Sequence, residues 1–385
     1  MVTRGFVVLR RQRGGSGRKT VALIGAGAVA VAAAGAGVVL LTAAHGQGRS
    51  TGATTPAGTA GQAQQAVPTR VISASPAPGA QGVSGVAPIR LTLAAPDPGA
   101  PLPRISPAVP GSWRRAGDTL TFTPAGGFGP HTRVTVSVPP SDGSWTGGYT
   151  TGGYSLLRLQ QLLAQLGYLP LTWAADPGGM VTLDDPASPI AAAYTPPAGT
   201  FSWDRGYPLT LSRFWRPGQV NLVTTGAIMA FESQHDMTMH QSVSPALWTA
   251  VLRAAGQRQT NRSGYTYAIA SKTLPETLTI WHDGHRVFRG YANTGIGVAP
   301  TAAGTYPVYL RYYFQIMKGT NPDGSHYADP VYYVSYFNGG EAVHYFPRGS
   351  YGWPQSLGCV ELPYSAAAKA WPYLTYGSLV TVTPA

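Results

Sequence analysis

The chain has 385 residues, of which 44% are hydrophobic and 11% are charged, and its formal net charge is +12 at pH 7. This hydrophobic content is enough for several packed cores and excludes a mainly disordered chain. The 49 glycines and 34 prolines favour short strands joined by turns, so we expect a multidomain, mainly β protein. Basic residues are spread thinly after the first twenty positions, which argues against nucleic acid as a partner and for a diffuse attraction to anionic polymers.

The first 44 residues have the pattern of a membrane anchor. Residues 1–20 contain six basic residues and no acid, and residues 21–44 are uncharged and rich in Ala, Gly, Val and Leu. As a helix, the apolar stretch is long enough to cross about 30 Å of hydrocarbon, and the basic flank should stay in the cytoplasm. We expect a single-pass protein whose remaining domains lie outside, where the anionic polymers are those of the cell wall or lipid headgroups. The alternative is a signal peptide cleaved after the small residues at positions 42–44.

Residues 45–68 are polar and small, with Val67 as the single large apolar side chain. Such a composition cannot repay the entropy of ordering, so we predict a flexible linker.

Residues 69–150 alternate between polar and apolar positions in short runs bounded by Pro and Gly. The clearest runs are residues 89–93, 119–122 and 133–138. Period-two alternation at this spacing predicts a small β-sandwich. Residues 78–83, 111–113 and 134–139 resemble bacterial Ig-like domains that precede cell-wall enzymes, which implies a spacer.

Residues 151–260 contain three predicted helices. Ser155 is a candidate N-cap, Gly167 a candidate terminator, and four leucines between them share one helix face. A second helix is predicted from Ser244-Pro245 to Gly256, with Leu247, Val251 and Leu252 buried, and a short one over residues 227–232.

The order of these helices resembles the three-helix peptidoglycan-binding module, interrupted here by an insertion over about residues 171–220. The resemblance implies glycan binding. A domain that only packs against its neighbour is the other interpretation, because a shared fold does not carry function.

Residues 261–385 return to strand patterns. Residues 277–288 predict a hairpin whose two-residue turn is Asp283-Gly284. Further strands are predicted within residues 300–313, 332–337 and 379–382, and a short helix over residues 365–370. His282 and His285 flank the turn, but no further cluster of His, Cys or carboxylate residues supports them, so we expect no metal site.

Cys359 is the only cysteine in the chain. A lone thiol on the oxidising side of a membrane has no disulfide partner, which favours a reactive role as nucleophile. A nucleophilic thiol needs a base, and His344 is the nearest histidine in sequence. Gly358 allows the backbone to approach a substrate carbonyl, and the Ser356 hydroxyl is placed to orient the imidazole or the substrate by hydrogen bonding.

Four segments carry a further resemblance: residues 300–306 (PTAAGTY), His344, residues 356–362 (SLGCVEL) and residues 377–382 (GSLVTV). Together they resemble the YkuD-type L,D-transpeptidase catalytic domain. The resemblance implies a β-rich fold and transfer of peptidoglycan stem peptides from a terminal D-alanine to an amine, without cofactor or metal. It assigns Cys359 as the nucleophile and His344 as the base, with Ser356 and Gly358 as the supporting loop. Arg348 is a candidate partner for a substrate carboxylate, and Tyr336 a candidate lining residue.

Three positions differ from the family pattern. Leu357 replaces a frequent histidine, which leaves His344 as the single histidine of the motif. Glu361 stands where arginine is common, so a substrate carboxylate would lose an attractive partner there. Tyr345 follows His344 in place of glycine and would narrow the entrance. Two alternatives therefore stay open: an L,D-carboxypeptidase acting at the same site with water as acceptor, and a catalytically degenerate wall-binding scaffold.

Overall fold

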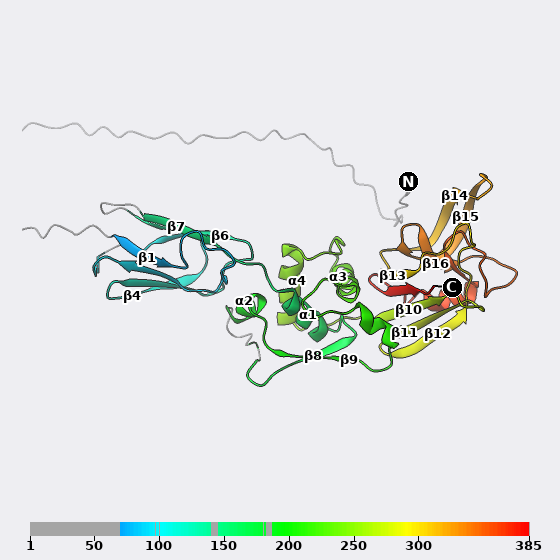
Figure 1. Cartoon of the computed structure of the whole chain (residues 1–385), viewed down its shortest axis with the longest axis horizontal. Coiled ribbons are helices and arrows are strands. Elements are labelled where there is room, and N and C mark those ends of the chain that lie inside the picture. Colours follow the sequence, from blue (N-terminus) through cyan, green and yellow to red (C-terminus); the bar gives the residue numbers. More distant parts are fainter. Residues whose placement is uncertain are drawn as a thin grey trace, which may run out of the picture. The chain divides into compact units, whose positions relative to one another are not determined.

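The computed structural model describes residues 70–96, 98–99, 101–139, 145–179, 181 and 187–384. The predicted anchor and linker lie outside these residues. Within the part of the chain that is described, no helix is long and apolar enough to span a membrane. The described chain is mainly β and multidomain, which confirms the expected fold class (Figure 1).

The first described segment is a sandwich of two antiparallel sheets. Their strand orders are β1-β2-β5-β4 and β3-β6-β7. Leu91, Leu120 and Val134 point inward and are fully buried, and they alternate with polar residues that face outward. The strands are β1 (Val71–Ser75), β2 (Ile89–Leu93), β3 (Arg104–Ser106), β4 (Gly111–Ala116), β5 (Thr119–Pro124), β6 (Arg133–Val138) and β7 (Trp145–Thr150).

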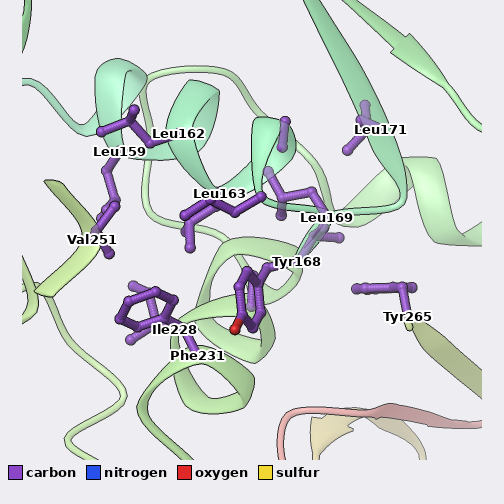
Figure 2. Close-up of a cluster of buried hydrophobic side chains, with 14 of the residues drawn as sticks. Leu159, Leu162, Leu163, Tyr168, Leu169, Leu171, Ile228, Phe231, Val251 and Tyr265 are labelled. Atoms are coloured by element: carbon purple, nitrogen blue, oxygen red, sulfur yellow. The ribbon is translucent and has the colours of Figure 1, made fainter. Parts of the chain in front are cut away.

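A helical module follows. It is built from α1 (Leu156–Gln165), α3 (Leu222–Gln234) and α4 (Pro245–Gly256). Leu163, Phe231 and Val251 meet in its hydrophobic core (Figure 2). The predicted insertion holds β8 (Leu171–Ala175), α2 (Ala187–Tyr194), β9 (Gly199–Trp203) and a 3-10 helix (Leu209–Phe214), and β8 pairs with β9.

The helix ends follow their local sequences. The Ser244 side chain accepts a hydrogen bond from the Leu247 amide, as expected of an N-cap. Ser155 occupies the N-cap position of α1 but makes no side-chain capping bond. Gly167 ends α1 with a φ of +76°, a conformation that favours glycine.

Helix α3 is longer than predicted. The sequence indicated residues 227–232, whereas α3 begins at Leu222 and ends at Gln234. The start of the helix was not predicted because residues 223–225 are β-branched, and such residues have lower helix propensity. Asn221 supplies the missing start signal, since its side chain accepts a hydrogen bond from the Thr224 amide.

Two sheets form the C-terminal region. Their strand orders are β12-β11-β10-β18-β13 and β14-β15-β16-β17. The core of the helical module continues into the first of these sheets through Tyr265, Tyr267 and Leu379. The elements are β10 (Thr266–Ser271), β11 (Thr277–His282), β12 (His285–Tyr291), β13 (Gly304–Pro307), β14 (Leu310–Thr320), β15 (His326–Asn338), β16 (Glu341–Tyr345), β17 (Val360–Leu362), α5 (Tyr364–Ala370) and β18 (Leu379–Val382).

The predicted turn at Asp283-Gly284 joins β11 to β12, and β18 has the predicted bounds. Strands are present within residues 300–313, as predicted, but they belong to two different sheets. β13 pairs with β18, and after Pro307 the chain enters β14, which pairs with β15. β15 is also longer than the predicted 332–337, since it continues into a long hairpin with β14 (Figure 1).

Candidate active site

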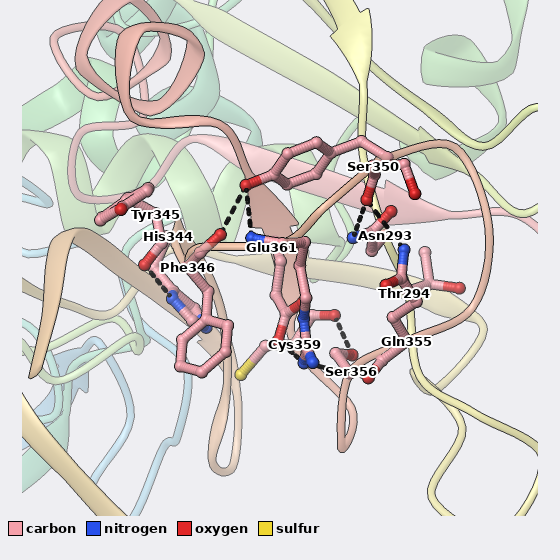
Figure 3. Close-up of polar contacts among 12 residues, drawn as sticks. Asn293, Thr294, His344, Tyr345, Phe346, Ser350, Gln355, Ser356, Cys359 and Glu361 are labelled. Atoms are coloured by element: carbon pink, nitrogen blue, oxygen red, sulfur yellow. Dashed lines mark hydrogen bonds and ion pairs between the residues drawn. The ribbon is translucent and has the colours of Figure 1, made fainter. Parts of the chain in front are cut away.

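Strands β16 and β17 bring the predicted nucleophile and base together. They pair in parallel, with His344 opposite Glu361 and Val343 opposite Val360. Cys359 directly precedes β17, and because side chains alternate along a strand it shares a face with Glu361 and His344. Cys359 and His344 are therefore diagonal neighbours at the end of the sheet, and Figure 3 draws both side chains.

The loop before Cys359 is held by hydrogen bonds of Ser356. Its hydroxyl donates to the Cys359 carbonyl at 2.6 Å and accepts from the Gly358 amide at 3.2 Å. Ser356 is fully buried, and no hydrogen bond to His344 is seen among the described residues. Its hydroxyl thus shapes the nucleophile loop rather than bonding to the imidazole, and a role in orienting the substrate stays a prediction. Gly358 has a φ of +111°, which a residue with a side chain rarely adopts.

A buried polar layer that the sequence did not reveal supports this loop. The Glu276 carboxylate accepts hydrogen bonds from the Thr294 amide (2.6 Å) and hydroxyl (2.7 Å), and the Thr294 carbonyl accepts from the Ser356 amide. Asn293 exchanges backbone hydrogen bonds with Glu361. All of these side chains are at most 4% exposed. Asn293 and Thr294 lie between the predicted hairpin, which ends at residue 288, and the next predicted strand region, which begins at residue 300, so no predicted element contained them.

His344 is 2% exposed and is fixed by one backbone contact. Its Nδ1 lies 2.9 Å from the Tyr345 carbonyl, and since a carbonyl only accepts, Nδ1 carries the hydrogen. Nε2 is then unprotonated in the neutral ring, and Figure 3 shows it on the side toward Phe346 and Cys359. Burial lowers the pKa of His344 below its usual value, so the imidazole is a neutral base at neutral pH.

The Cys359 thiol is equally enclosed. It is 8% exposed and packs with Val331, Val334, Tyr336 and Ala342. Burial raises the pKa of the thiol to about 12, and a hydrogen bond from the Ala342 backbone opposes that rise. The resting pair is consequently a neutral thiol and a neutral imidazole, rather than a preformed thiolate, and the proton must move when the sulfur attacks.

Arg348 is bound to Glu361. Its Nε and Nη2 lie 2.8 Å from the two Glu361 carboxylate oxygens, and Nη2 also donates to the Gln355 carbonyl at 3.0 Å. The guanidinium lies over the Phe346 ring at 4.6 Å. The Arg348 guanidinium is thus already paired with a carboxylate of the protein, which argues against Arg348 as the partner of a substrate carboxylate. Arg348 also compensates Glu361, which is 4% exposed beside the nucleophile.

Tyr336 lies in the same hydrophobic cluster as Cys359. It is 8% exposed, and its hydroxyl donates to Gln315 at 3.0 Å. Burial raises the pKa of Tyr336, so the hydroxyl stays neutral. Tyr336 is therefore part of the hydrophobic cluster that encloses the sulfur. Among the described residues no three His, Cys, Asp or Glu side chains are grouped to hold a metal ion.

Comparison with known families identifies this region. Residues 265–382 match the family model described as YkuD, the L,D-transpeptidase catalytic domain. The match contains both Cys359 and His344, together with the loop and the polar layer that support them. A search of curated proteins finds no match.

Several solved structures are similar. An L,D-transpeptidase from Mycobacterium smegmatis is 15% identical, with 83% of this chain and 100% of that chain covered and a TM-score of 0.29. L,D-transpeptidase 3 from Mycobacterium tuberculosis, in complex with a faropenem-derived adduct, is 17% identical over 82% of this chain and 98% of that chain, with a TM-score of 0.29. The catalytic domain of the E. faecium L,D-transpeptidase is 26% identical over 30% of this chain and 95% of that chain, with a TM-score of 0.28.

Because these TM-scores are low, the assignment rests on the family match and on the motif that it contains. Residues 265–382 form a YkuD-type L,D-transpeptidase catalytic domain.

Proposed function

We propose that the protein is an L,D-transpeptidase that acts on peptidoglycan stem peptides through a thioester on Cys359. The observation that carries the proposal is the placement of Cys359 beside His344, whose Nδ1 hydrogen is committed to the Tyr345 carbonyl. This contact leaves Nε2 as the basic atom. The family match supports the same reaction class.

The first half-reaction removes D-alanine from the donor stem. The sulfur attacks the carbonyl carbon that precedes the terminal D-alanine, and Nε2 of His344 accepts the thiol proton as the S–C bond forms. The tetrahedral intermediate collapses with cleavage of the C–N bond, and the imidazolium returns the proton to the departing amine. The thioester remains on Cys359.

The second half-reaction transfers the acyl group. An amine of a neighbouring stem attacks the thioester and His344 takes its proton. The C–S bond then breaks, and the imidazolium gives this proton to the departing sulfur, which restores the thiol and the neutral imidazole. Water in place of the amine would yield a shortened stem and make the enzyme a carboxypeptidase. The closed surroundings of Cys359, with the nucleophile 8% exposed, favour a site from which bulk water is largely excluded.

Residues 1–44 place this activity at the outer face of a membrane in our proposal. The six basic residues before position 21 and the uncharged stretch after them support a single-pass anchor with the catalytic domain extracytoplasmic. Protease added outside intact protoplasts should then reach the Cys359 domain of a full-length, membrane-bound protein.

The reaction is tested with purified protein, a donor tetrapeptide stem ending in D-alanine, and an acceptor stem with a free side-chain amine. Mass spectrometry should find D-alanine and a crosslinked dimer in equal amounts, and neither with Cys359→Ala. If the products are D-alanine and shortened stems without a crosslinked dimer, the protein is an L,D-carboxypeptidase and the proposed transpeptidase reaction is wrong. Binding to cell walls without either product would identify a scaffold.

A further inference from the structure

The outer face of the β1-β2-β5-β4 sheet has an ordered arrangement of cations and hydroxyls. Ser75 pairs with Arg90, Arg90 with Thr121, and Thr121 with Arg114, so these four residues form one row across the sheet. The other outward positions on these strands include five more Ser and Thr residues: Ser73, Thr92, Ser112, Thr119 and Thr123.

Neither guanidinium in the row is neutralised. Arg90 and Arg114 are exposed, and no ion pair is seen for either within the described residues. The described strands of the sandwich contain no Asp or Glu. Arg90 and Arg114 lie two strands apart, which corresponds to about 10 Å across the sheet.

Protection against edge-to-edge aggregation explains only part of this pattern. β4 is an edge strand, where a charged residue such as Arg114 prevents pairing with another chain. β2, which carries Arg90, is an interior strand with neighbours on both sides, so Arg90 is not needed to protect a free strand edge. Hydroxyls around the row also distinguish it from the apolar centre of a protein–protein interface.

The chemistry of the row selects the partner. Guanidinium groups bind phosphate and carboxylate, and Ser and Thr hydroxyls exchange hydrogen bonds with the hydroxyls of a sugar or polyol. A flat sheet face does not enclose a small anion, so useful affinity requires several charges on one chain to bind at once. An acidic polymer with repeating charges meets that requirement.

We propose that this face, centred on Arg90 and Arg114, binds an acidic glycopolymer whose hydroxyl-rich units carry phosphate or carboxylate groups. The sandwich then holds the catalytic domain at its substrate layer. The proposal does not depend on the reaction at Cys359.

The test measures binding of the full-length protein, in mild detergent, to immobilised polyglycerol phosphate, polygalacturonate and neutral dextran. Arg90→Gln/Arg114→Gln should weaken binding to an acidic polymer by about tenfold at low ionic strength, and added salt should shrink the difference. The matched control is Arg213→Gln/Arg253→Gln, which removes two exposed arginines from the helical module instead of from the sandwich. It should lose less than about twofold.

The polymer that binds more tightly identifies the charged group as phosphate or carboxylate, and either result supports the proposal. Equal loss in both double variants would show that net charge alone acts and would overturn it. Tighter binding to anionic phospholipid vesicles or duplex DNA than to either polymer would also overturn it. Unchanged unfolding midpoints in both variants serve as the folding control.

Discussion

The nucleophile loop and the core of the helical module are both buried, but different interactions hold them. The loop depends on short hydrogen bonds of Ser356 and on the layer formed by Glu276 and Thr294. The helical core consists of apolar side chains such as Leu163 and Phe231 (Figure 2). Apolar burial contributes most of the folding free energy, whereas a hydrogen bond contributes about 1 kcal/mol net. Substitutions in the two regions should therefore separate activity from stability.

Cys359→Ala should give the largest effect in the loop. Without the sulfur no thioester forms, so D-alanine release should fall below detection. The change removes one atom from a small cluster and should cost only about 1 kcal/mol of unfolding free energy. D-Alanine release and urea unfolding measure the two quantities, and turnover by the variant would reject the nucleophile.

Leu163→Ala tests the opposite region. Leu163 is fully buried, so truncation should cost about 2–5 kcal/mol through lost burial and a residual cavity. Activity per folded molecule should stay within about twofold, because no described contact joins Leu163 to the site. Leu209→Ala, at a side chain that is 87% exposed in the same module, is the matched control and should change stability by less than about 0.5 kcal/mol. A large loss of activity in folded Leu163→Ala would show that the helical core and the active site are coupled, and would contradict this prediction.

His344→Gln should reduce acylation by at least about a hundredfold near neutral pH. The pKa of His344 is lowered, so its basic form persists to below the usual histidine range, and wild-type acylation should rise with pH through a midpoint under 6.5. The thiol pKa of about 12 predicts slow alkylation until the solution is strongly alkaline. Acylation rates across pH should lose the lower inflection in His344→Gln and keep it in the control His285→Gln, which changes an exposed histidine. Superimposable profiles for His344→Gln and wild type would remove the base assignment.

Arg348→Gln should have the smallest effect of the four. It leaves the buried Glu361 carboxylate uncompensated, which should cost about 1–2 kcal/mol after allowance for the partial exposure of Arg348. Alkylation of Cys359 should slow as well, since an uncompensated negative charge disfavours the thiolate. Arg348→Gln/Glu361→Gln should recover most of the stability. A double variant less stable than the single one would contradict the compensation.

The sequence predicted those features of the site that depend on local pattern. Cys359, His344 and Gly358 could be found from the motif, and the Asp283-Gly284 turn and the Ser244 cap from short-range chemistry. Glu276 and Thr294 were missed because they reach Ser356 from a distant part of the chain. The Arg348–Glu361 pair was missed for a different reason. Arg348 was interpreted as a substrate partner and Glu361 as a difference from the family pattern, and the two were not considered as an ion pair.

Intact-protein mass spectrometry of the protein with a tetrapeptide donor, in the absence of an acceptor, tests the central claim most directly. We expect a single adduct with the mass of the donor minus D-alanine, located on Cys359 by peptide mapping and removed by an acceptor amine. Release of D-alanine without any adduct on Cys359, or an adduct on another residue, would contradict it.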